Sequence, residues 1–217
     1  MFRKKIDEDR EILLQAFYNL EDKISQKLGV GDAVIAFTAT AEGANKIASI
    51  YTMAKHLSEE NERILVIDTN LRSDELEDLK GSYNNRGFVD LLLGDYHIED
   101  VVVKDDDNLH LLMTGRVSEY EEMFLEPSVI KNFFEDVKDR YDYVFLNVKE
   151  NIGIAEANVF AGLADKTAIF TTKANSESYL LEESASQLEK SGADIIGVII
   201  SDYDYKEDEL DDLFGGN

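Results

Sequence analysis

Short, almost entirely apolar runs alternate along this chain with longer segments that have helical periodicity. The predicted strands are the runs at 33–38, 64–67, 109–113, 143–147, 168–171 and 195–200. Because most of these runs are apolar on both faces, they indicate a mostly parallel central sheet covered by helices on both faces. The predicted fold class is therefore a three-layer α/β fold, in which ligands bind beyond the carboxyl ends of the strands.

Helical spacing of apolar residues fills the segments between these strands. The predicted helices lie at about 9–27, 46–58, 73–80, 87–94, from Pro127 onward, 154–163 and 177–190. A length of 217 residues with 44% hydrophobic content is typical of one well-packed domain. We expect an N-terminal helical segment at 1–30, packed on or flanking a single domain at 31–205, and an acidic tail at 206–217.

Composition excludes several classes of function. The chain has no cysteine, so disulfides, thiolate metal sites and cysteine nucleophiles are ruled out. The net charge of -24 disfavours nucleic acid and anionic lipid as direct partners. That charge serves either solubility or recognition by a basic partner surface. No apolar run reaches the ~18 residues of a membrane span, and no signal peptide is apparent, so a cytoplasmic location is expected.

A small-residue loop and a lysine follow the first predicted strand. Backbone N–H groups and the helix dipole at such a place face an anion, while the lysine neutralises it. Against the phosphate-loop pattern G-x-x-x-x-G-K-[ST], Thr40 replaces the first glycine, Asn45 the second and Ile47 the serine or threonine. Only Lys46 remains in its place, and by itself the segment is better explained as a plain strand–helix turn.

Further segments match a family pattern in order and spacing. They are Thr38–Ala48, Ile67–Arg72, Gly87–Gly94, Asn108–Gly115, Tyr141–Asn147 and Gly197–Asp204. Together they resemble the bacterial tyrosine kinases of capsule and exopolysaccharide biosynthesis, a branch of the P-loop fold close to the MinD/ParA ATPases. The resemblance runs from about residue 15 to residue 204 and implies a three-layer P-loop NTPase-like fold.

The sequence departs from that family at the positions that bind magnesium in its members. In such kinases magnesium is held by the loop serine or threonine, supported by carboxylates that end the second and fourth strands. The corresponding residues here are Ile47, Asp68 with Asn70, and Asn147. We therefore expect no metal site and no intact catalytic residue, with Asp68, Asn70 and Asn147 as vestiges.

Residual phosphate or nucleotide binding remains an open alternative. The resemblance assigns it to Gly43, Ala44, Asn45, Lys46 and Ile47, with Ser201 and Asp204 near the base. A lysine in the first turn of a helix opposes the helix dipole, which mildly favours an anion-binding role. The expectation is either no cofactor, or ATP or ADP bound with weak or no dependence on magnesium.

Two other family features are reduced. The E-x-x-R-x-x-R motif that builds an oligomeric ring maps to Gln15, Tyr18 and Glu21. The C-terminal tyrosine cluster, which accepts phosphate in the family, is reduced to Tyr203 and Tyr205, and these two either pack or serve as phosphoacceptors.

Losses at the metal ligands, the ring motif and the tyrosine cluster favour a non-enzymatic role. The expected function is that of a catalytically degenerate tyrosine-kinase-like protein, regulatory or scaffolding in capsular or exopolysaccharide synthesis or export. Its expected partner is the cytoplasmic tail of a membrane polysaccharide co-polymerase, or an active kinase paralogue, either of which would recruit it to the inner face of the membrane. Two alternatives stay open: an active tyrosine autokinase or ATPase with a deviant loop, and a MinD/ParA-like positioning protein. The latter class needs an early loop lysine, which 39–41 lacks.

Overall fold

A computed structural model describes residues 2–44, 46–71, 75–81, 86–94, 96–115 and 126–203, with side chains described from residue 11 onward. Within these ranges the strands are β1 (Val34–Ala39), β2 (Ile64–Asp68), β3 (Val103–Lys104), β4 (Leu109–Leu112), β5 (Tyr143–Asn147), β6 (Lys166–Thr171) and β7 (Ile195–Ile200). They form one seven-stranded sheet in the order β3-β4-β2-β5-β1-β6-β7. Every pair is parallel except β3 with β4.

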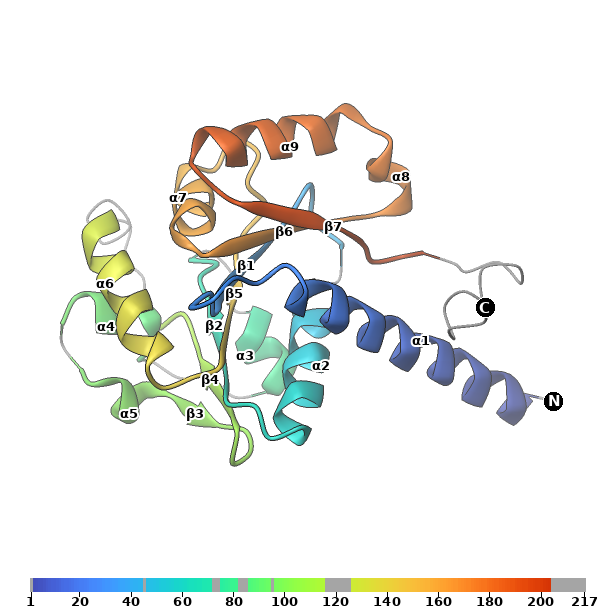
Figure 1. Cartoon of the computed structure of the whole chain (residues 1–217), viewed down its shortest axis with the longest axis horizontal. Coiled ribbons are helices and arrows are strands. Elements are labelled where there is room, and N and C mark those ends of the chain that lie inside the picture. Colours follow the sequence, from blue (N-terminus) through green and yellow to red (C-terminus); the bar gives the residue numbers. More distant parts are fainter. Residues whose placement is uncertain are drawn as a thin grey trace.

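Helices cover both faces of this sheet (Figure 1). They are α1 (Phe2–Ser25), α2 (Lys46–Glu59), α3 (Glu75–Lys80), α4 (Phe88–Leu92), α5 (Ile98–Val101), α6 (Pro127–Lys138), α7 (Ala155–Leu163), α8 (Lys173–Ser176) and α9 (Tyr179–Lys190). One core cluster joins the sheet to α1, α2 and α3, and the other joins it to α4, α5, α6, α7 and α9. The predicted three-layer α/β fold is confirmed.

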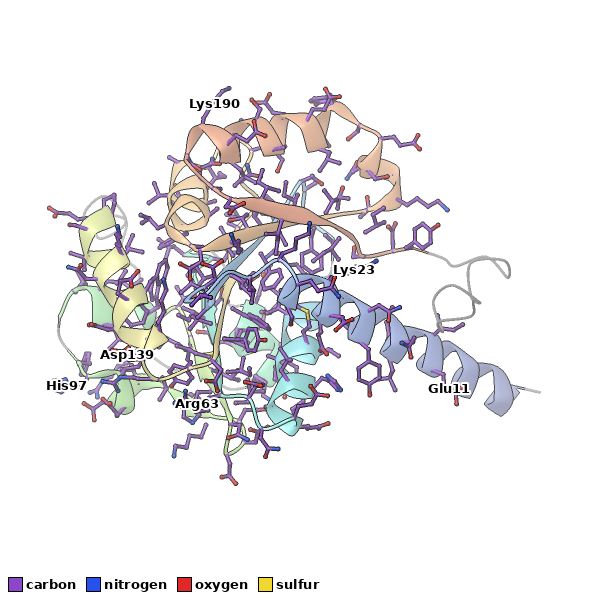
Figure 2. All side chains as sticks on the ribbon, viewed as in Figure 1. Glu11, Lys23, Arg63, His97, Asp139 and Lys190 are labelled. Carbon is purple, nitrogen blue, oxygen red and sulfur yellow. The ribbon has the colours of Figure 1, made fainter. Side chains whose placement is uncertain are left out.

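Side chains fill the space between the sheet and the helices on both faces (Figure 2). The central strands β1 and β2 are buried along their whole length, which explains why their sequences are apolar without alternation. The N-terminal half of α1 runs away from this body, and Glu11 lies far from the sheet (Figure 2). At the other end of α1, Ile24 is buried in a core cluster. None of the described helices is long and apolar enough to cross a membrane.

Most sequence-based boundaries agree closely with the structure. The strands predicted at 143–147 and 195–200 have the observed bounds, and the other four differ by at most two residues at either end. The helix predicted at about 177–190 is observed as α9, which begins two residues later, and the single turn α8 before it was not predicted. The two-residue strand β3 and the single-turn helix α5 were not predicted, and the tail at 206–217 lies outside the described residues.

Two glycine-containing segments of the family pattern meet beside β4. A Cβ atom added at Gly87 would lie 2.1 Å from the backbone oxygen of Met113, so the two backbones are too close for any other residue. The N–H of Gly87 donates to Oδ2 of Asp90 at 2.8 Å, and the N–H of Phe88 donates to the Met113 oxygen at 2.8 Å. These contacts explain why glycine precedes the short helix α4.

The start of α9 depends on its N-cap serine. Oγ of Ser178 accepts a hydrogen bond from the N–H of Leu180 at 3.3 Å. Ser178→Ala is therefore expected to lower the free energy of unfolding by about 1 kcal/mol in urea denaturation. Ser176→Ala is the matched control, because the Ser176 hydroxyl only donates to the Lys173 carbonyl within the exposed helix α8. An equal loss in both variants would show that capping is not the cause.

Candidate functional site

Four polar side chains meet where β2 and β5 end. Asp68 ends β2, Asn147 ends β5, Lys46 begins α2 and Glu75 begins α3. Asp68 and Asn147 lie side by side in the register of the β2–β5 pair. We call Lys46, Asp68, Glu75 and Asn147 the strand-end cluster. The parallel sheet builds it, because the carboxyl ends of neighbouring strands face the same edge.

Asn147 is the centre of this cluster. Its Nδ2 donates to Oδ1 of Asp68 at 3.0 Å and to Oε2 of Glu75 at 2.9 Å. Its Oδ1 accepts a hydrogen bond from Nζ of Lys46. The side-chain amide thus bridges one cation and two carboxylates, which a carboxylate in the same position could not do because it has no donor.

Burial makes the cluster part of the protein interior. Asp68 and Asn147 are 0% exposed and Lys46 is only 6% exposed. Burial lowers the pKa of Lys46, while the carboxylates of Glu75, Asp68 and Glu150 oppose that shift. Burial raises the pKa of Asp68 to about 7, against the opposing effect of backbone hydrogen bonds and of Lys46. A buried ammonium needs such partners, so Lys46 is held by the fold itself.

The raised pKa of Asp68 predicts a pH dependence of stability. Between the ordinary pKa of aspartate and about 7, native Asp68 keeps a proton that the unfolded chain releases. Its contribution to stability is therefore present at low pH and is lost as the pH rises to about 7. Asp68→Asn cannot titrate, so its free energy of unfolding should rise relative to wild type from pH ~4 to pH ~7 and then stay level. Urea denaturation across that range measures this, and a pH-independent difference would contradict it.

The side chains at this site fit a magnesium ion poorly. Magnesium prefers octahedral oxygen ligands. Ile47 packs against the core, and the Asn147 oxygen is bound to Lys46. Both carboxylate oxygens of Asp68 accept backbone N–H groups, from Asn70 at 3.0 Å and from Leu76 at 3.2 Å. Among the described residues, no group of three or more histidine, cysteine, aspartate or glutamate side chains could hold a metal ion.

Asn70, another predicted vestige, lies beside the cluster and does not join it. It is buried, and its side-chain oxygen Oδ1 has no hydrogen-bond partner within the described part of the chain. Its own N–H is the group that donates to Asp68. Asn70 therefore orients the Asp68 carboxylate through its backbone.

Hydrogen bonds of two threonines connect β1 and the loop before α2 to the neighbouring strands. Oγ1 of Thr38 donates to the Lys149 carbonyl at 2.6 Å, and the hydroxyls of Thr40 and Thr171 lie 3.0 Å apart. Gly43 has a φ of 87°, a conformation that favours glycine. Ala44 is buried in the same core cluster that Ile47 contacts.

The remaining predicted binding residues are not brought to the cluster. The N–H of Ser201 donates to the Thr171 carbonyl at 3.0 Å, so Ser201 contacts β6. Among the described residues, Ser201 is linked to the loop through Thr171 and Thr40. Asn45 and Asp204 lie outside the described residues.

The residues in the ring-motif positions are engaged within the chain. Nε2 of Gln15 donates to Oδ1 of Asn19, and Oε2 of Glu21 lies 2.7 Å from Nδ1 of His56 in α2. The ring of Tyr18 packs edge-on against the same histidine. Tyr203 is 38% exposed and lies under the Lys173 ammonium, while Tyr205 is outside the described residues.

Sequence reasoning missed Glu75 as a member of the cluster. The only signal was acid in the first turn of α3, and Glu75, Glu77 and Asp78 all supply it. Acid at that place is ordinarily explained by the helix dipole. No pattern distinguished the one carboxylate that reaches Asn147.

Comparison with known proteins assigns the family. The sequence pattern of the AAA domain matches residues 32–191, which is well over half of the chain. The chain belongs to this AAA domain family. Fold and family thus agree with the P-loop NTPase-like architecture expected from the motifs.

Individual relatives within this range are distant. The chain is 20% identical to the tyrosine-protein kinase CpsD of Streptococcus agalactiae, over 86% of this chain and 82% of CpsD. It is 23% identical to the succinoglycan biosynthesis transport protein ExoP of Rhizobium meliloti, over 93% of this chain and 26% of ExoP. It is 26% identical to the septum site-determining protein MinD of Bacillus subtilis, over 66% of this chain and 54% of MinD.

Solved structures support the fold. The kinase domain of VpsO superimposes with a TM-score of 0.75 at 20% identity, covering 92% of this chain and 99% of that domain. At this identity the likeness establishes the three-layer architecture and no shared activity.

Proposed function

We propose that this chain is a catalytically degenerate relative of the bacterial tyrosine kinases, with a regulatory or scaffolding role in capsular or exopolysaccharide synthesis or export. The observation that carries the proposal is the contact of the Lys46 ammonium with Oδ1 of Asn147. A phosphate-loop lysine acts by reaching the phosphates of the nucleotide. Here the lysine is already paired inside the protein, and its partner is the asparagine that stands in place of a carboxylate.

Energetics supports the same proposal. Phosphoryl transfer depends on metal ions and positioned cations that neutralise charge on the transferred group. Removing one such stabilising group typically costs about 2.7–4 kcal/mol in activation free energy. In this chain Ile47 stands in place of the loop ligand and Asn147 in place of the strand-end carboxylate. Lys46 contacts Asn147, so its ammonium is not free to bind phosphate. Together these changes would bring phosphoryl transfer close to the uncatalysed rate.

Without catalysis, the role would rest on binding a partner. The partner would be the cytoplasmic tail of a membrane polysaccharide co-polymerase, or an active kinase paralogue, which would bring this chain to the inner face of the membrane. The similarity to CpsD and ExoP supports this setting. The charge of -24 favours a partner with a basic surface.

The proposal is tested by comparing turnover with regulation. Purified chain incubated with labelled ATP and magnesium should show no autophosphorylation above a Lys46→Met control. Added to an active tyrosine kinase from the same cell, it should change the autophosphorylation rate of that kinase. Turnover well above the control would contradict the degenerate role, and an unchanged rate of the active kinase would contradict the regulatory one.

A MinD-like positioning role is the second candidate, favoured by the similarity to MinD. That class dimerises over nucleotide and needs an early loop lysine, which 39–41 lacks. Light scattering with and without ATP distinguishes the two candidates. A mass that does not change with nucleotide counts against the MinD-like role, and a nucleotide-dependent dimer would support it.

A further inference from the structure

Strand β7 is an apolar edge of the sheet. It pairs with β6 on one side and with no other described strand. Its sequence, Ile-Ile-Gly-Val-Ile-Ile, contains no charge and no proline, which are two of the devices that protect an edge strand. The opposite edge, β3, is only two residues long and includes Lys104. Of the two edge strands, β7 is therefore the one that is long and uncharged enough to pair with another strand.

The middle of β7 is open to solvent. Val198 is 45% exposed, and a Cβ atom added at Gly197 would meet nothing within 4 Å. The N–H of Ser201 donates to Thr171 of β6. Because alternate residues of a strand direct their backbone groups to opposite sides, the N–H and C=O groups of Val198 and Ile200 point away from β6. No backbone hydrogen bond joins β7 to a segment other than β6 in the described part of the chain.

Charged residues next to β7 do not obstruct this edge. Asp194, just before the strand, is 2.6 Å from Nζ of Lys166. Asp202, just after it, accepts a hydrogen bond from the N–H of Lys173. Both carboxylates are thus held by partners within the same chain. An approaching strand would meet the outward backbone groups of β7, flanked by isoleucine and valine side chains.

We propose that the free edge of β7 pairs antiparallel with β7 of a second copy of this chain, forming a two-fold symmetric dimer. A second copy fits because it brings the same uncharged strand, and because antiparallel pairing of identical strands satisfies both rows of outward backbone groups. The open space over Gly197 accommodates a side chain of the opposite strand. This inference goes beyond the proposed function and needs neither nucleotide nor the strand-end cluster.

The size and charge of the partners set the strength of this dimer. One strand pair buries less area than a standard stable interface, so the dimer should be concentration-dependent. Each copy carries a net charge of -24, which opposes association. Salt screens this repulsion, so the dimer fraction should increase with ionic strength.

Sedimentation of the full chain over a range of concentrations tests the proposal, with Val198→Lys as the disrupting variant. Two opposed lysines would repel at the centre of the pair, and the dissociation constant should rise by about tenfold or more. Val30→Lys is the control, because Val30 is likewise an exposed valine and lies outside every described strand. The control should dimerise as the wild type does.

A second variant, Val198→Pro, keeps the proposal testable if Val198→Lys does not fold. Val198→Pro removes an N–H that points away from β6, so the sheet of the single chain should persist while the edge is blocked. Circular dichroism confirms folding of each variant. A wild type that stays monomeric at every concentration and ionic strength would overturn the proposal and leave the edge to another occupant, including the chain's own residues after β7. Unchanged dimerisation of folded Val198→Lys or Val198→Pro would overturn it equally.

Discussion

Lys46→Met is expected to lower the free energy of unfolding by about 3 kcal/mol, the upper range for leaving a buried hydrogen-bonding group without its charged partner. The ammonium of Lys46 is buried, contacts Asn147 and is attracted by Asp68 and Glu75. Methionine preserves the length of the side chain but leaves the buried Asp68 carboxylate and the Asn147 oxygen without a cation. Urea denaturation, extrapolated linearly to water, measures the loss.

The matched control for this prediction is Lys149→Met. Lys149 is partly exposed, and its ammonium is 3.8 Å from Glu150. A pair of that kind contributes at most about 1 kcal/mol. A lysine kept free for phosphate would oppose the helix dipole in the empty protein, so its removal would leave stability unchanged or higher. That outcome for Lys46→Met would contradict the pairing described here.

Asn147→Asp is expected to have the second large effect, a loss of about 2–3 kcal/mol in the absence of divalent ions. The substitution removes the Nδ2 group that donates to Asp68 and Glu75. It also places a third carboxylate between those two, where like charges repel. Three oxygen-bearing groups then surround one point, which is the kind of donor set that magnesium prefers.

Magnesium should therefore restore the stability of Asn147→Asp and leave the wild type unchanged. Linkage gives about 2.7 kcal/mol of stabilisation when magnesium is present at one hundred times its dissociation constant. Asn151→Asp is the control, because Asn151 is equally buried and donates to Ser184 and Asn158 rather than to carboxylates. It should be destabilised without rescue. Thermal unfolding with magnesium or with chelator measures all three proteins, and a wild type stabilised by magnesium would contradict the account.

The fold could be predicted from sequence because the pattern of burial follows the strands directly. Strands buried along all or nearly all of their length, such as β2 and β5, are apolar runs, and their ends place Asp68 and Asn147 at one edge of a parallel sheet. The two-residue β3 has no such pattern, since periodicity needs several residues to appear.

The contacts of the site could be predicted only in part. The positions of Lys46, Asp68 and Asn147 followed from the strand ends, but the pairing of Lys46 with Asn147 depends on the direction of two side chains. Glu75 joins from a helix whose first turn contains three acids, and nothing local selects one of them. Likewise, the contacts of Tyr18 and Glu21 with His56 depend on how α1 lies on α2.

The central claim is that the polar groups of the strand-end cluster bind one another and no longer bind a nucleotide. Isothermal titration of the wild-type chain with ATP and magnesium tests this claim most directly. We predict no binding heat at millimolar nucleotide, with or without magnesium, because Lys46 is held by Asn147 and both oxygens of Asp68 are engaged. Saturable, magnesium-dependent heat that disappears in folded Lys46→Met would contradict the claim and return Lys46 to a phosphate-binding role.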